Sequence, residues 1–516
     1  MPAAQAAAPP GRPDLARFYA QRIEWEDCAD EMAQLLVVER GDVFVPGHAA
    51  RSECGRVEVP RDYAHPNGSA GTATIAMLRL KATDPKHRLG SLVLNFGGPG
   101  QSGVTALNSL AESFSRLNTR YDLVAHDPRG VRGSDPVLCE PPLDAGAPVD
   151  QTPDTRAEAV QVADAQRAHN ARCKNKDALA VLPWVGTADS ARDLDVIRAA
   201  LGDDSLSYLG FSYGTKLGAA YLHQFPGKAG RLVLDGVDDP TLDARGIALA
   251  NSRAFQKALE NFLTDCVHRG ARECPLGATR AAAEKKVETL FNALDRQSLT
   301  TDAGLLDQSA FIRGVEESLY NQASGWPVLR TALTGLAVEH DGSALVELAG
   351  GRTGNGIGSG TGSGNGIGRT VVTADDPVQA SDAQRAVTCR DTNDRPTAQD
   401  YVDTVSQAVK ASPVFGKSLA AGMLQCTGWP VTGDTRTLPV DAASAPPALL
   451  VATRGDPATP YEGAAHMAAA LGNHSRVLTY EGEGHGAYLT SSACVHEHVE
   501  RFLTTKTLPP ENATCT

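Results

Sequence analysis

Ser212, Asp456 and His485 have the types and the chain order of a nucleophile, its acid and its base. Ser212 lies in GFSYG (residues 210–214), which fits the G-x-S-x-G pattern of a sharp turn between a strand and a helix. A serine hydroxyl is a poor nucleophile until a base removes its proton, and that base needs a third group to fix its tautomer. This short pattern also occurs by chance, so its surroundings must decide.

The acid and the base should follow late strands. Asp456 comes after ALLVATRG, and His485 comes after RVLTYEGEG. In an open α/β sheet the carboxyl ends of the strands form the edge where ligands bind, and the order Ser, acid, His fits one such fold. Asp235 is a competing acid, because it ends the strand after the nucleophile helix and some members of the fold take their acid there. The late-strand position favours Asp456.

The base is expected to be His485 rather than another histidine. It lies in GEGHGAY, a loop flanked by glycines. His474 precedes its strand, and His466, His496 and His498 lie on helical segments.

The oxyanion of a tetrahedral intermediate needs two hydrogen-bond donors. The backbone N–H of Tyr213, next to the serine, is the first candidate. The second should come from the loop after an early strand, here NFGGPGQSG (residues 95–103), where we choose Gly98 because its backbone can approach a substrate closely.

Strands and helices alternate from about Thr72, which places these residues on an α/β-hydrolase fold with a mainly parallel sheet. The predicted strands include TATIAMLRL, GSLVLNF, YDLVAHD and GRLVLDGV. An irregular stretch with Cys139 and Cys173 follows the third of these. Thr187 can then cap a helix, ADSARDLDVIRAAL, which Gly202 ends.

About 200 residues with helical patterns separate Val237 from Pro446, far more than one or two βα units require. We therefore expect an inserted helical lid. The predicted organisation is a flexible leader (1–20), a first core part (21–240), the lid (241–440) and a second core part (441–516). The Gly-rich stretch 350–370 is a flexible loop, since it lacks the Gly-Lys-Ser/Thr ending of a phosphate-binding loop.

The composition excludes several classes of function. The net charge of −13 leaves no basic stripe for nucleic acid, and 42% hydrophobic residues fit a globular protein. No apolar run approaches the roughly 20 residues of a membrane helix. The first residues, MPAAQAAAPP, lack the pattern of an intact signal peptide, so we interpret them as a leader from which a signal is absent.

The ten cysteines predict a disulfide-bonded, secreted protein. Proximity along the chain suggests the pairs Cys28–Cys54, Cys139–Cys173, Cys266–Cys274, Cys389–Cys426 and Cys494–Cys515. The alternative is ten reduced thiols in a cytosolic enzyme. None of them forms a CxxC metal pair, and CVHEHVE lacks a second nearby cysteine, so no metal is expected.

Six motifs together resemble the secreted tripeptidyl aminopeptidases of actinobacteria, within the proline-iminopeptidase branch of the α/β-hydrolases: NFGGPGQSG, HDPRGVRGSD, ARDLDVIRAALG, GFSYGTKLGAAY, DPATPYEGA and GHGAY. IEWEDC, CGRVEVPRDY, AVTCRD, CTGWP and ATC extend the likeness over nearly the whole chain. The resemblance implies a Ser212/Asp456/His485 triad, secretion, and serine-peptidase activity on free N-termini. Gln101, where relatives often carry glycine, and the Gly-rich insert depart from it.

The leading hypothesis is therefore a monomeric exopeptidase without a cofactor, which releases tripeptides from peptides with a free N-terminus. A carboxylesterase with the same triad and a silent binding protein on a hydrolase scaffold are the alternatives. An exopeptidase needs a lid carboxylate to face the substrate ammonium group. Candidates are Glu316, Glu317, Asp391 and Asp394, of which Asp391 is favoured because a Cys389 bridged to Cys426 would hold its segment rigid.

Overall fold

The computed structural model describes residues 14–28, 52–140, 149–350, 377–434, 439–489 and 492–516. Residues 1–13 of the expected leader and residues 351–370 of the expected Gly-rich loop lie outside these ranges. Within the expected leader, Ala16–Tyr19 form the short helix α1. Phe18 is 1% exposed and packs in a core cluster with Val57 and Leu194, so this part of the segment is anchored rather than flexible.

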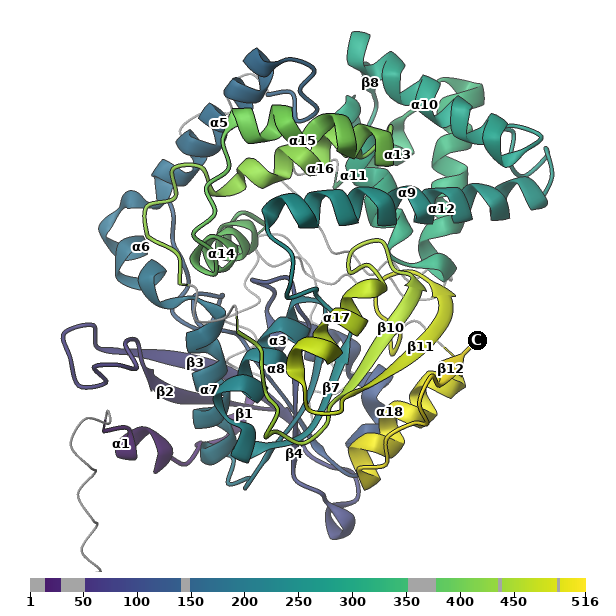
Figure 1. Cartoon of the computed structure of the whole chain (residues 1–516). Coiled ribbons are helices and arrows are strands. Elements are labelled where there is room, and N and C mark those ends of the chain that lie inside the picture. Colours follow the sequence, from purple (N-terminus) through teal and green to yellow (C-terminus); the bar gives the residue numbers. More distant parts are fainter. Residues whose placement is uncertain (1–13, 29–51, 141–148, 351–376, 435–438, 490–491) are drawn as a thin grey trace, which may run out of the picture.

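One mixed sheet carries the fold, and within the described ranges its strands run in the order β1-β2-β3-β5-β4-β6-β7-β10-β11-β12 (Figure 1). The neighbours from β5 through β12 are parallel, whereas β1, β2, β3 and β5 pair antiparallel. The strands are β1 Glu26–Asp27, β2 Ser52–Pro60, β3 Thr72–Leu80, β4 Ser91–Asn95, β5 Asp122–His126, β6 Leu206–Phe211, β7 Ala229–Asp235, β10 Leu449–Gly455, β11 Arg476–Glu483 and β12 Thr514–Cys515. The predicted α/β-hydrolase sheet is confirmed.

The central strands are buried along their whole length because helices cover both faces of the sheet. Every residue of β4, β5 and β6 is buried. Along β4, Leu92 and Leu94 join one hydrophobic cluster with the first set of helices, and Val93 joins the other cluster. The first set is α3 Gly103–Leu110 and α18 Ala493–Thr505; the second is α7 Thr187–Ala200, α8 Tyr213–Gln224 and α17 Glu462–Leu471.

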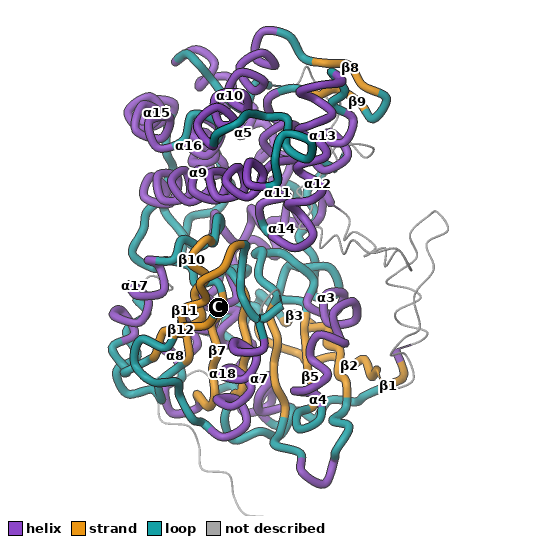
Figure 2. Tube along the Cα trace, turned by 90° about the vertical axis from the view of Figure 1, so that its right-hand side faces the viewer, coloured by secondary structure: helices purple, strands orange, loops and turns teal. Residues whose placement is uncertain are grey.

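A layer of helices, which we call the cap, lies over one edge of the sheet (Figures 1 and 2). Its elements are α5 Arg156–Ala171, α9 Ala244–His268, α10 Arg280–Arg296, α11 Gln308–Leu319, α12 Gln322–Thr334, α13 Ser343–Leu348, α14 Pro377–Arg390, α15 Ala398–Ala411 and α16 Gly416–Gly422, with a hairpin of β8 Leu299–Thr301 and β9 Gly304–Leu306. The expected helical insertion is present.

The cap also includes a segment that precedes the nucleophile Ser212 in the sequence. The stretch that looked irregular holds α5 and α6 (Lys176–Val181), and a capping box of Thr155 and Glu158 begins α5. Val162 of α5 packs with Tyr401 of α15 in one hydrophobic cluster. The amphipathic signal of α5 is weak because two of its four buried residues are alanine and another is asparagine, which explains why the pattern was missed.

The remaining elements are short. They are α4 Ser115–Asn118, the 3₁₀ helices Pro85–His87, Ala111–Phe114, Arg172–Lys174, Leu182–Trp184, Pro226–Lys228 and Met423–Cys426, and a π-helical turn Gly335–Glu339.

The structure joins the ten cysteines in the five pairs suggested by their proximity. Cys389–Cys426 links α14 to the 3₁₀ helix that ends at Cys426. A helix long and apolar enough to cross a membrane is not found in the described ranges.

Candidate active site

Ser212 occupies the sharp turn between β6 and α8. Its φ of 55° and ψ of −125° are a backbone conformation that L-residues rarely adopt, at a cost of about 1–3 kcal/mol. The flanking glycines are required, because a Cβ on Gly210 would lie 2.5 Å from the Gly214 carbonyl oxygen, and one on Gly214 would lie 2.8 Å from Asn95 Oδ1. The turn therefore presents the serine at the head of a helix.

His485 and Asp456 lie within hydrogen-bond distance of each other. His485 Nδ1 is 2.9 Å from Asp456 Oδ1 and 3.0 Å from Oδ2. Asp456 is buried and also accepts the N–H groups of Ala458, Thr459 and Gly486 at 2.8–3.1 Å. An ionised Asp456 accepts the proton on Nδ1, which leaves Nε2 as the basic nitrogen of the ring.

Thr459 is a member of this cluster that sequence reasoning missed. Its hydroxyl donates to Asp456 Oδ2 at 2.9 Å, and its Oγ1 is 3.2 Å from His485 Nδ1. The DPAT turn that carries it was visible in the sequence, but a threonine three residues after an acid has many uses. With its N–H and its hydroxyl, Thr459 donates to both oxygens of the Asp456 carboxylate.

The charges around His485 favour its protonated form. Burial by itself lowers the pKa of His485, but the carboxylates of Asp456, Asp235 and Asp238 raise it above the ordinary value. These carboxylates would therefore stabilise an imidazolium formed on His485 during a reaction.

Ser212 and His485 both lie next to the end of β7. The N–H of Ser212 donates to the Asp235 carbonyl at 2.9 Å. On the next residue, a Cβ on Gly236 would lie 3.3 Å from His485 Cε1. The nucleophile and the base therefore flank the same two-residue segment. Asp235, the competing acid, directs its carboxylate to the N–H groups of Ala487 and Tyr488.

The loop after β4 packs directly on the nucleophile turn. A Cβ on Gly97 would lie 2.7 Å from the Phe211 carbonyl oxygen and 2.9 Å from Ser212 Cβ, so only glycine fits there. The Gly97 N–H donates to Asn95 Oδ1 at 3.0 Å. In the described part of the chain, the N–H groups of Gly98 and Tyr213 have no hydrogen-bond partner. These two N–H groups therefore remain the expected donors to an oxyanion.

The cap contacts the proposed base through Tyr320, a residue that no sequence pattern singled out. The Tyr320 carbonyl accepts the N–H of His485 at 2.8 Å. The two rings pack edge to face, with centroids 5.3 Å apart and an interplanar angle of 80°. Asn321 and Gly484 form an isolated antiparallel bridge beside this contact. The turn between α11 and α12 therefore lies on the histidine loop.

Asp391, the favoured amine-binding candidate, has both carboxylate oxygens engaged. It is 2% exposed, and its Oδ1 accepts the N–H of Thr187 at 2.8 Å. Its Oδ2 accepts the Thr187 hydroxyl at 2.5 Å and pairs with Lys216 at 2.9 Å. This network ties the cap to α7 and α8 and engages both oxygens of Asp391 within the protein.

Glu316, in contrast to Asp391, has a carboxylate oxygen without a hydrogen-bond partner in the described part of the chain. Burial raises the pKa of its carboxyl to about 8, and its buried Oε1 has no hydrogen-bond partner among the described residues. After burial, the charges of Glu316 and Glu317 are the next causes that raise the pKa of Tyr320, whose ring packs on His485. Glu316, a half-buried residue with an Oε1 unsatisfied within the described ranges, thus lies one turn of α11 from the contact with the base.

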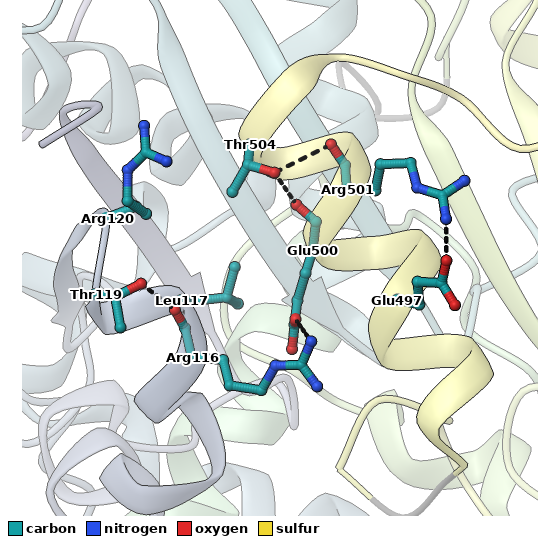
Figure 3. Close-up of a pocket in the computed structure, with 8 residues that line it drawn as sticks. All are labelled: Arg116, Leu117, Thr119, Arg120, Glu497, Glu500, Arg501 and Thr504. Carbon is teal, nitrogen blue, oxygen red and sulfur yellow. Dashed lines mark hydrogen bonds and ion pairs between the residues drawn. The ribbon is translucent and has the colours of Figure 1, made fainter. Parts of the chain in front are cut away.

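A separate cavity of about 480 Å³ lies between α4 and α18 (Figure 3). It is lined by Arg116, Leu117, Thr119, Arg120, Glu497, Glu500, Arg501 and Thr504. Its charges mostly pair with each other: Arg116 lies 2.8 Å from Glu500, and Arg501 pairs with Glu497. None of the residues discussed above lines it.

Two groups of side chains have the spacing of metal ligands among the described residues, Cys494 with His498 and Cys515, and Cys139 with Cys173 and Asp382. In both groups the cysteines form disulfides, so they offer no thiolate.

Comparison with known proteins finds similar chains and family models. Residues 90–345 match a family model described as alpha/beta hydrolase fold, and residues 412–515 match one described as TAP-like protein. Serine protease Hip1 of Mycobacterium tuberculosis is 33% identical over 513 residues, which cover 96% of this chain and 91% of that protein. Tripeptidyl aminopeptidase of Streptomyces coelicolor is 31% identical over 509 residues, covering 97% and 87%. Carboxylesterase B of Mycobacterium tuberculosis is 29% identical over 518 residues, covering 98% and 91%.

Proposed function

The chain belongs to the tripeptidyl aminopeptidase family of α/β-hydrolases, and from this premise we propose that it is a secreted serine exopeptidase that releases tripeptides from free N-termini. The observation that carries the proposal is the hydrogen-bonded pair of His485 and Asp456 beside the strained turn of Ser212. Hydrolysis of peptides or esters is the activity common to the named relatives.

In the proposed mechanism, His485 Nε2 takes the proton of Ser212 as the hydroxyl attacks the substrate carbonyl. Asp456 holds the ring and stabilises the imidazolium, and the N–H groups of Gly98 and Tyr213 bind the oxyanion. The imidazolium then gives its proton to the leaving amine, and an acyl-enzyme on Ser212 remains. A water molecule, activated by the same histidine, hydrolyses that ester and restores the serine.

Glu316 is the proposed anchor for the substrate ammonium group, with Glu317 beside it. A carboxyl whose pKa is about 8 is poorly solvated, so an ammonium group in contact with it forms a charge-assisted hydrogen bond worth roughly 1.5–3 kcal/mol. The cap would thereby stop a peptide at a fixed distance from Ser212, which is what distinguishes an exopeptidase from an endopeptidase.

Five disulfides support export to an oxidising compartment. The cap, expected at residues 241–440 and joined by α5, would act as the lid over the site.

The proposal is tested by comparing three substrates: a tripeptide anilide, the same anilide with an acetylated amine, and a short acyl ester. We expect acetylation to reduce kcat/KM roughly tenfold or more, from the energy of the anchor contact. Glu316→Gln should remove most of this preference and leave ester hydrolysis nearly unchanged. Glu339→Gln, the same change at an exposed cap residue, is the matched control.

A carboxylesterase is the second candidate, because the same constellation attacks esters more readily than amides and one relative is named carboxylesterase B. Equal rates on free and acetylated peptides, together with faster ester hydrolysis, would replace the exopeptidase by this alternative.

A further inference from the structure

Asp235 contacts both halves of the proposed catalytic machinery. It is the last residue of β7 and is 0% exposed. In the sheet register it lies between Phe211, the residue before the nucleophile, and Val451 of β10. Its position therefore depends on the two strands that lead to Ser212 and toward Asp456.

The main chain of Asp235 holds the nucleophile. Its carbonyl accepts the N–H of Ser212 at 2.9 Å, and the next N–H, that of Gly236, donates to the Val451 carbonyl at 3.1 Å. A residue in a strained conformation persists only where surrounding contacts hold it. This hydrogen bond is one such contact for Ser212.

The side chain of Asp235 holds the loop of the base. Oδ1 accepts the N–H of Ala487 at 2.9 Å, and Oδ2 accepts the N–H of Tyr488 at 2.8 Å. These two residues follow His485 by two and three positions, with Gly486 at a φ of 72° between. One buried carboxylate thus fixes the segment on which the imidazole is carried.

We infer that Asp235 is a positioning residue that sets the geometry between Ser212 and His485, through its carbonyl to the first and its carboxylate to the loop of the second. The inference rests on the proposed function, in which these two residues react with each other. It also explains why the sequence made Asp235 a competitor of Asp456: both carboxylates lie at the same site, but only Asp456 contacts the imidazole ring.

A carboxylate suits this role better than an amide. Two N–H donors converge on its two oxygens, so an asparagine would turn an NH₂ group toward one of them. The charge also reaches His485, since Asp235 is one of the groups that raise the pKa of His485. The other groups facing the imidazole are Asp456 and Asp238 from the core and Tyr320 from the cap.

The test is Asp235→Asn in the full chain, assayed with a short acyl ester and a fluorophosphonate so that the readout does not depend on peptide specificity. A misplaced base should lower kcat about 10- to 100-fold with little change in KM. Loss of a negative charge should also move the acid limb of kcat/KM to lower pH, which a purely structural defect would not do. Asp122→Asn is the matched control. Asp122, the first residue of β5, is also a buried carboxylate, and it accepts the N–H of Ala82.

Asp235→Glu separates charge from position and serves if the asparagine variant does not fold. This variant should keep the acid limb of kcat/KM near that of the wild type, and its kcat should still be reduced. An unchanged kcat and acid limb in Asp235→Asn would overturn the inference, as would a loss matched in Asp122→Asn. A loss larger than that of Asp456→Asn would make Asp235 the acid instead. If the wild-type protein is not labelled at Ser212, the proposed function itself fails.

Discussion

The carbonyl oxygen of Tyr320 accepts a hydrogen bond from the N–H of His485 at 2.8 Å, which joins the cap to the proposed catalytic base. Tyr320 ends the segment that also carries Glu316, and its ring packs edge to face on the imidazole. The element that would recognise the substrate amine and the loop that would move the proton are therefore in direct contact. A cap displaced from this position would leave the histidine loop without one of its hydrogen bonds.

The first prediction concerns the nucleophile and the base. Ser212→Ala and His485→Ala should each remove nearly all turnover, and the double variant should lose little more, because the residues act as one proton-transfer unit. Initial rates on an anilide and an ester measure this. A fluorophosphonate should label the wild type at Ser212 and leave Ser212→Ala unmodified. Labelling at another serine would contradict the assignment.

The second prediction concerns pH. Because the base acts in its neutral form, kcat/KM should fall as pH decreases through the pKa of His485, which lies above the ordinary value near 6.5. Asp456→Asn removes the nearest negative charge, so the acid limb should move to lower pH while kcat falls about 10³- to 10⁴-fold. If the wild type and Asp456→Asn have the same acid limb in their pH profiles, Asp456 is not the carboxylate that pairs with His485.

The third prediction concerns the contact between the cap and the base. Tyr320→Phe keeps the ring that packs on His485 and should retain most activity. Tyr320→Ala removes the ring and should lower kcat about tenfold or more, since small displacements of a catalytic group are costly. Thermal unfolding of both variants provides the control. A loss of activity that parallels a loss of folded protein would refute the positioning role.

The fourth prediction concerns Asp391. Asp391→Asn leaves Lys216 without its ionic partner, and the network with Thr187 loses an acceptor. We expect the variant to be destabilised by about 1–3 kcal/mol and to keep its preference for a free substrate amine. Urea unfolding and the pair of free and acetylated anilides measure the two effects. A lost preference in a fully stable variant would restore Asp391 as the anchor.

The fifth prediction concerns the disulfide between Cys389 and Cys426. Mass mapping under non-reducing conditions should find this bridge and no free thiol in the exported protein. Replacing both cysteines by alanine should cost about 2–4 kcal/mol of unfolding free energy, since the bridge constrains the unfolded chain. Alkylatable cysteines in protein recovered from its native compartment would argue against an exported enzyme.

Several features followed from the sequence because they depend on short segments. The GFSYG turn needs two glycines beside Ser212, so the pattern itself is the steric requirement. Buried strands such as β4 and β6 are short, mainly apolar segments between turns, and that composition can be recognised from the sequence alone. The disulfide partners lie 8–37 residues apart, so proximity along the chain suggested them.

Other features were decided by the tertiary structure alone. Tyr320 and His485 are far apart in sequence, and their contact arises because the turn between α11 and α12 packs on the loop after β11. Asp391 and Glu316 are both acidic residues of the cap, and nothing local distinguishes them. Only the fold places Asp391 against Thr187 and Lys216 and leaves Oε1 of Glu316 without a partner among the described residues. The reason is that hydrogen-bond satisfaction of a buried oxygen depends on which distant segments surround it.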